Sequence, residues 1–115
     1  MMTINEVIDK WRECHPESNI NEGQLTQIAN NFLDLIRAWI LNDKNEETKS
    51  AIYEIVLHYG NNSTIITDVN ETSAVYEIMK HIFPNDKKYE TCDLVSTYFD
   101  NGKKVENVLG TLTIV

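Results

Sequence analysis

The stretch from Asn21 to Trp39 spaces its apolar residues three or four positions apart, which is the spacing of one face of an α-helix. The residues of this stripe are Leu25, Ile28, Phe32, Leu35, Ile36 and Trp39. Asn21 followed three residues later by Gln24 is a capping pattern that opens a helix. This is the strongest helix prediction in the chain, and 115 residues are enough to build one domain around it.

A shorter helix is predicted at the start of the chain, over about residues 4–14. Thr3 and Glu6 have the spacing of a capping box, in which each side chain bonds to the other residue's backbone N–H. His15 precedes Pro16, which biases it toward extended geometry, so the helix should end there.

Two more helices are predicted in the middle of the chain. Asn45 can cap a third helix that Gly60 would end, and a fourth follows Asn70 and closes at Pro84. The inward-facing residues expected in the third helix are Ala51, Ile52, Ile55, Val56 and Tyr59. Those expected in the fourth are Val75, Ile78, Met79 and Ile82.

Strands are predicted between and after these last two helices. Residues 63–67 are rich in Ile and Thr, which favours a short strand. Residues 89–100 fit either a helix or a strand, but Asn101-Gly102 is a strong signal for a two-residue hairpin turn, so we predict a C-terminal hairpin with a bulge or bend at Gly110. The expected fold is α+β, with about four mostly N-terminal helices packed on an antiparallel sheet of about three strands.

The N-terminus has no basic start and no apolar run of signal-peptide length, so we expect a cytoplasmic protein without a membrane span. Cys14 and Cys92 are then expected to be free thiols. The formal net charge is −8, and residues 1–79 carry 13 acidic and 5 basic side chains. Such a surface repels phosphate backbones, which disfavours direct nucleic-acid binding.

The stretch Glu13-Cys14-His15-Pro16-Glu17 places a thiol, an imidazole and two carboxylates side by side. A nucleophilic cysteine needs its base and the group orienting that base close in space, which adjacency in sequence does not provide. We therefore expect Cys14 to be a half-buried helix residue and His15 a loop residue at the helix end. No metal site, cofactor or catalytic residue is predicted.

The acidic residues of the first helix are concentrated on one side. On a helical wheel Glu6, Asp9 and Glu13 lie within about 60° of one another, opposite the apolar stripe. We predict that the partner-binding residues are Glu6, Asp9, Glu13, Glu17, Glu22, Glu46, Glu47, Tyr53 and Glu54. Glu17 and Glu22 extend the stripe through a loop, and we expect the last four residues on the outer side of the predicted third helix. Tyr89 is a further aromatic candidate.

Three classes of function fit these features. The first is a binding protein that neutralises a basic partner, because small immunity proteins of bacterial toxin systems and phage-encoded inhibitors are similar in size, charge and lack of motif. The second is a chaperone or assembly adaptor acting through an apolar helix face, and the third is a small enzyme. The acidic stripe also has a simpler interpretation, a solvated surface that keeps the protein soluble. The sequence does not decide between a monomer and a homodimer.

Overall fold

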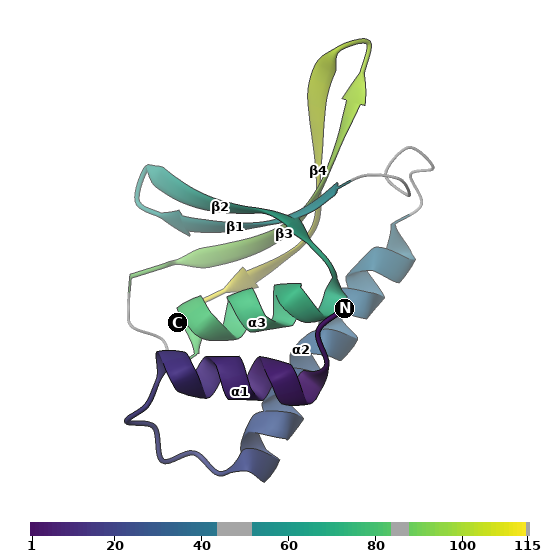
Figure 1. Cartoon of the computed structure of the whole chain (residues 1–115). Coiled ribbons are helices and arrows are strands. Elements are labelled where there is room, and N and C mark those ends of the chain that lie inside the picture. Colours follow the sequence, from purple (N-terminus) through teal and green to yellow (C-terminus); the bar gives the residue numbers. More distant parts are fainter. Residues whose placement is uncertain (44–51, 84–87, 115) are drawn as a thin grey trace.

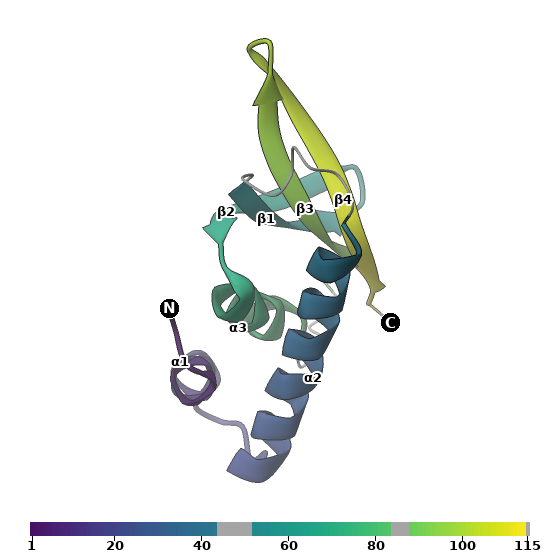
Figure 2. The same cartoon turned by 90° about the vertical axis from the view of Figure 1, so that its right-hand side faces the viewer.

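The computed structural model describes residues 1–43, 52–83 and 88–114, which form three helices and four strands. The strands make one antiparallel sheet in the order β2-β1-β3-β4. The helices all lie on one side of this sheet, with α3 between α1 and the strands (Figures 1 and 2). The α+β class is confirmed, but one predicted helix is a strand. No described helix is long and apolar enough to cross a bilayer.

Each of the three helices begins at the capping residue that the sequence indicates. Helix α1 spans Ile4–Cys14 and α2 spans Glu22–Asn42, and the caps Thr3 and Asn21 accept hydrogen bonds from the backbone N–H groups of the third helical residues. Helix α3 spans Glu71–Ile82 and starts with a capping box between Asn70 and Ser73. Side-chain oxygens thus satisfy N–H groups that have no partner within the helix.

The segment predicted as the third helix is strand β1, Ile52–Tyr59, so that prediction is wrong. Residues Ile55, Val56 and Tyr59 fit helical spacing, but Ile55 and Leu57 are fully buried while Val56 between them is only half-buried, an alternation that belongs to a strand. The β-branched and aromatic residues of this segment are typical of a strand and were the sequence feature that favoured one. Its predicted cap, Asn45, lies outside the described residues.

Strand β2, Asn62–Val69, confirms the predicted strand and pairs with β1 through a tight turn. Gly60 has φ of +58°, the left-handed conformation expected of it, but it turns a hairpin instead of ending a helix. The register of this pairing shifts between Tyr53 and Ile55, and Asp68 on the facing part of β2 has a positive φ.

Strands β3, Thr91–Asp100, and β4, Lys103–Thr113, form the predicted C-terminal hairpin, whose tip projects beyond β1 and β2 (Figure 1). Asn101 and Gly102 both have positive φ, as a two-residue turn of this kind requires. The register shifts where Leu94 lies opposite Gly110, so the predicted bulge is confirmed. A Cβ atom on Gly110 would fall 2.1 Å from the Trp39 ring, so the indole of α2 packs directly on the glycine backbone.

The hydrophobic core lies between the helices and the inner face of the sheet. Trp11 on α1 is fully buried, and its indole N–H donates to the carbonyl oxygens of Met79 at 3.1 Å and Phe83 at 2.8 Å. Ile55 and Leu57 face the helices from β1, and Cys92 and Leu94 do so from β3. The indole therefore joins α1 to the end of α3 through both packing and hydrogen bonds.

Candidate partner-binding surface

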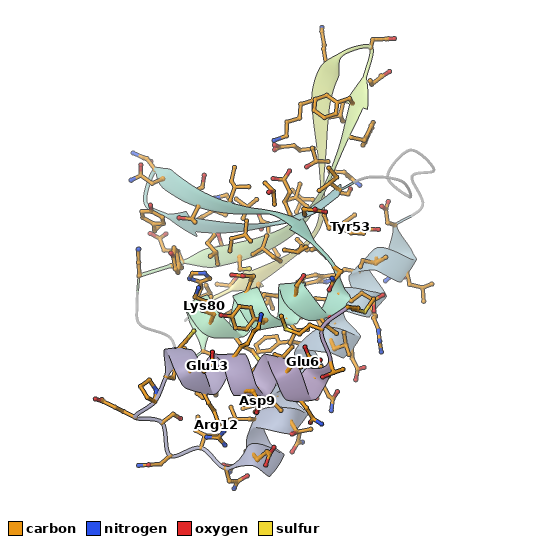
Figure 3. The ribbon with its side chains drawn as sticks, in the orientation of Figure 1. Glu6, Asp9, Arg12, Glu13, Tyr53 and Lys80 are labelled. Atoms are coloured by element: carbon orange, nitrogen blue, oxygen red, sulfur yellow. The ribbon has the colours of Figure 1, made fainter. Side chains whose placement is uncertain are left out.

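The predicted acidic stripe is present on the surface of α1. Glu6, Asp9 and Glu13 are all exposed and follow one another along the helix (Figure 3). Val7, Ile8 and Trp11 are buried on the opposite side of the same helix. Glu17 and Glu22 are also exposed, in the α1–α2 loop and at the first residue of α2. We call these five acidic residues the acidic face.

The loop that carries Glu17 is held by hydrogen bonds to its backbone. Arg12 donates from Nη2 to the carbonyl oxygen of Ile20 at 2.9 Å, and the Ile20 N–H donates to the Ser18 hydroxyl at 3.3 Å. The Ser18 N–H donates to the carbonyl oxygen of His15 at 3.1 Å. These contacts give the acidic face a defined shape beyond the end of α1.

The two basic residues of α1 are engaged beside the acidic face. The Arg12 guanidinium binds the Ile20 carbonyl, as above, and the Lys10 ammonium lies 5.9 Å from the centre of the Tyr76 ring. Lys80 of α3 lies at the same distance from that ring (Figure 3 labels Arg12 and Lys80). Within the described ranges, none of the five carboxylates forms an ion pair. Direct contacts with the described basic residues therefore do not neutralise the negative charge of the acidic face.

Glu54 does not belong to the acidic face. It was predicted to be exposed on a helix, and this prediction is wrong. It lies on β1 with its side chain directed to the sheet face that is turned away from the helices, and it is only 3% exposed. Its Oε1 accepts a hydrogen bond from the Thr97 hydroxyl and lies 3.7 Å from the Lys104 ammonium. Its Oε2 is buried with no hydrogen-bond partner in the described part of the chain.

Neither of the two aromatic candidates is exposed, and the predicted place of Tyr53 on a helix is wrong. Tyr53 is half-buried on β1 and packs against the core, so it is not on an outer helix side. Burial chiefly raises the pKa of its hydroxyl, and Asp43 and Glu71 raise it further. Tyr89 is buried and meets Tyr59 edge to face, with ring centres 5.4 Å apart. The remaining predicted residues, Glu46 and Glu47, lie outside the described residues.

The sheet face turned away from the helices carries a surface that the sequence did not predict. We call it the outer sheet face and define it by Ile52, Glu54, Val56, Ile65, Val95, Thr97, Phe99, Lys104, Glu106 and Val108. Phe99 is 69% exposed and Val108 56% exposed, and Ile52 and Ile65 are about half exposed. The sequence feature that indicates such a surface is the apolar residues of β1, which occur both among those that point to the helices and among those that point away from them. A strand of this kind has apolar contacts on both faces of its sheet.

Beyond Val56 on the same side of the sheet, polar residues form a row across three strands. His58 Nε2 lies 2.8 Å from Asp93 Oδ2, and the Thr111 hydroxyl donates to Asp93 Oδ1 at 2.7 Å. Ser63 is the cross-strand neighbour of His58, but these two described side chains form no hydrogen bond. In the described part of the chain, the imidazole of His58 is therefore bound by Asp93, and the hydroxyl of Ser63 is not hydrogen-bonded to it.

The Cys14-His15 pair is not arranged for thiol catalysis. His15 stacks on Trp11 with ring centres 4.4 Å apart, and its Nδ1 lies 3.0 Å from the Trp11 carbonyl oxygen. Cys14 is exposed, against the expected half-burial, and its Sγ lies 3.5 Å from the Tyr76 hydroxyl. The imidazole thus binds its own helix end. Residues 14–18 line a pocket of about 450 Å³.

Cys92 is a buried free thiol on the inner face of β3. Burial, with a smaller contribution from Asp93, raises the pKa of this thiol to about 12, so it stays protonated at neutral pH. The described residues contain no group of three or more His, Cys, Asp or Glu side chains that could hold a metal ion.

Comparison with known proteins gives no relative for this chain. No protein-family model, curated protein or solved structure matches it.

Proposed function

We propose that this chain is a small acidic, non-enzymatic binding protein that neutralises a basic partner in the cytoplasm. An immunity protein or inhibitor of a bacterial toxin, such as a nuclease, is the form of this function that we favour. A nuclease carries a cationic groove for its substrate, and an acidic protein can cover that groove by direct contact. The same acidity makes direct binding of nucleic acid by the chain itself unfavourable.

The observation that carries this proposal is the acidic face. Its five exposed carboxylates lie on α1, on the following loop and at the start of α2, without an ion-pair partner in the described ranges. Arg12 and Lys10, the basic residues closest in sequence, contact the Ile20 carbonyl and the Tyr76 ring instead of these carboxylates. Uncompensated charge of one sign accelerates association with a partner of opposite sign.

The test is a pull-down from a lysate of the source cell with the tagged protein, followed by assays of what is recovered. We expect one basic protein that moderate salt releases and whose activity the chain inhibits. Glu6→Lys/Asp9→Lys/Glu13→Lys should slow association at least tenfold, because it turns a steering attraction into repulsion.

The matched controls are the single variants Asp9→Lys and Asp34→Lys. Both aspartates are exposed helix residues without an ion pair in the described part of the chain, but only Asp9 belongs to the acidic face. Asp9→Lys should weaken binding and Asp34→Lys should not. Equal binding by the triple variant would reject the acidic face as a docking surface.

A chaperone or assembly adaptor is the second candidate, and the exposed apolar side chains favour it. Apart from Met1 and Leu41, the large apolar residues that are exposed in the described chain lie on the sheet, with Phe99 and Val108 the most exposed among them, whereas the apolar stripe of α1 is buried in the core. An adaptor should form a homodimer or bind extended peptides. Sedimentation of the isolated protein and binding of unfolded polypeptide separate it from an inhibitor of one folded enzyme.

A further inference from the structure

The outer sheet face combines exposed apolar residues with one buried carboxylate. Among the large apolar residues that are exposed in the described chain, all except Met1 and Leu41 lie on this face. The helices occupy the opposite side of the sheet (Figure 2), so no described helix covers the outer sheet face. An exposed apolar patch of this kind marks a contact surface.

Glu54 lies among these apolar residues. Val95 is its direct cross-strand neighbour on β3, and Val95 is in turn paired with Val108 on β4. Both Glu54 and Val95 are less than 5% exposed. A carboxylate in such surroundings needs hydrogen-bond donors for both oxygens, because little water reaches it.

The described neighbours provide for only one of the two oxygens. The Thr97 hydroxyl and the Lys104 ammonium both approach Oε1, and Oε2 has no hydrogen-bond partner in the described part of the chain. The Lys104 ammonium is only weakly bound to Glu54. Its side chain is 46% exposed, and the ammonium lies closer to Glu106, at 3.3 Å, than to Glu54, at 3.7 Å. Among the described residues, Glu54 Oε2 therefore has no donor, and the Lys104 ammonium near Oε1 can be displaced.

We infer that the outer sheet face binds an arginine side chain of the basic partner, with its guanidinium on Glu54 in place of Lys104 and with Phe99 and Val108 packed around it. Arginine fits because its planar guanidinium donates two parallel hydrogen bonds and can reach both carboxylate oxygens at once. It is also less strongly hydrated than the lysine ammonium and enters an apolar setting more readily. This inference rests on the proposed function, since both assume a basic protein partner.

The test uses ethylguanidinium chloride as an arginine side-chain probe, titrated into the ¹⁵N-labelled full chain and followed by amide chemical shifts. We expect saturable shifts centred on Glu54, Val95 and Thr97, with a dissociation constant in the millimolar range that is typical of a single small contact. Ethylammonium chloride at equal concentration should produce much smaller shifts. Equal shifts with ethylammonium would reject the assignment to arginine.

Two variants test whether Glu54 is the anchor. Glu54→Gln keeps the shape of the side chain but removes its charge, and it should weaken the probe roughly tenfold. Lys104→Met removes the competing ammonium and should tighten binding about threefold or more. The Lys104 variant also covers the case in which Glu54→Gln fails to fold, which its amide spectrum would show. Absence of saturable shifts in both the wild type and Lys104→Met overturns the inference.

Two further results separate this inference from its alternatives. The triple variant Glu6→Lys/Asp9→Lys/Glu13→Lys should still bind ethylguanidinium at Glu54, so the two surfaces fail or succeed independently. If that triple variant loses the partner while Glu54→Gln retains full affinity, the proposed function stands and the inference fails. Sedimentation provides the other check, because a dimer that Phe99→Ser abolishes would assign the outer sheet face to a second copy of the chain.

Discussion

The acidic face and the outer sheet face arrange charged and apolar groups in opposite ways. On α1 the carboxylates are exposed and Trp11 is buried beneath them, whereas on the sheet Phe99 is exposed and the Glu54 carboxylate is buried. Exposed charges act on a partner over roughly one Debye length, about 8 Å at physiological salt. The buried carboxylate of Glu54 forms hydrogen bonds only with a group that comes within contact distance of it. The first surface is thus suited to attracting a partner and the second to selecting it.

The largest effect is expected on the inner side of α1, beneath the acidic face. Trp11→Ala should lower the free energy of unfolding by about 3–5 kcal/mol, because it removes a fully buried indole. Trp11→Phe should cost less, since it keeps a ring and loses mainly the two hydrogen bonds to Met79 and Phe83. Urea unfolding measures both. A loss below about 1 kcal/mol for Trp11→Ala would contradict the described core.

The next effect compares two threonine hydroxyls that donate to carboxylates on the sheet. Thr97→Val should cost about 1–3 kcal/mol, because it leaves the buried Glu54 without its described hydroxyl donor. Thr111→Val removes the donor to Asp93, where both partners are more exposed, and should cost less than about 1 kcal/mol. Thermal or urea unfolding checks the order of the two. Equal costs would mean that burial of Glu54 does not govern its dependence on neighbours.

The two cysteines provide a third contrast, between the surface of α1 and the inner side of the sheet. The pKa of Cys92 is raised from 9.0 to about 12, so below pH 9 folded and unfolded chains both keep the proton. Between pH 9 and 12 only the unfolded chain loses it, and stability should fall with rising pH by about 1.4 kcal/mol per unit. Unfolding measured from pH 8 to 10.5 tests this.

Cys92→Ala is the control for the alkaline experiment. It should lower stability at pH 8 because it removes a buried side chain, and it should remove this part of the pH dependence while other groups still titrate. Alkylation of the native chain at pH 8 should modify the exposed Cys14 and leave Cys92 unmodified. A wild-type slope equal to that of Cys92→Ala would show that the buried thiol ionises in the folded chain.

The smallest stability effect is expected on the acidic face itself. Asp9→Asn and Glu13→Gln should change the free energy of unfolding by less than about 0.5 kcal/mol, because both side chains are exposed and form no described ion pair. The same two changes should slow association with a basic partner. Unfolding and association rates measured on the same samples test the pair of expectations, and a large loss of stability would make these acids structural.

The sequence predicted best where the structural signal is local. The caps Thr3, Asn21 and Asn70 and the turn at Asn101 act within a few residues, so their effects can be read from neighbouring positions. The carboxylates of α1 could also be placed on one side, because helical periodicity fixes their directions.

Strand β1 shows why the rest could not be predicted. Its apolar residues fit a helix or a strand, and its pairing with β3, almost forty residues later, decides between them. With the segment taken as a helix, Glu54 was expected in solvent, and its partners Thr97 and Lys104 could not be foreseen. The same error hid the outer sheet face, since a surface made from four strands requires their order and register.

The packing of Trp39 on Gly110 has a consequence for the order in which the chain can fold. Helix α2 is synthesised early, but the end that carries Trp39 packs on the backbone of the last strand. A nascent chain can form α2 and cap it at Asn21. The C-terminal end of α2, however, can pack only after β4 has left the ribosome. We expect ribosome-bound chains that stop before residue 103 to leave this indole accessible and prone to capture by chaperones.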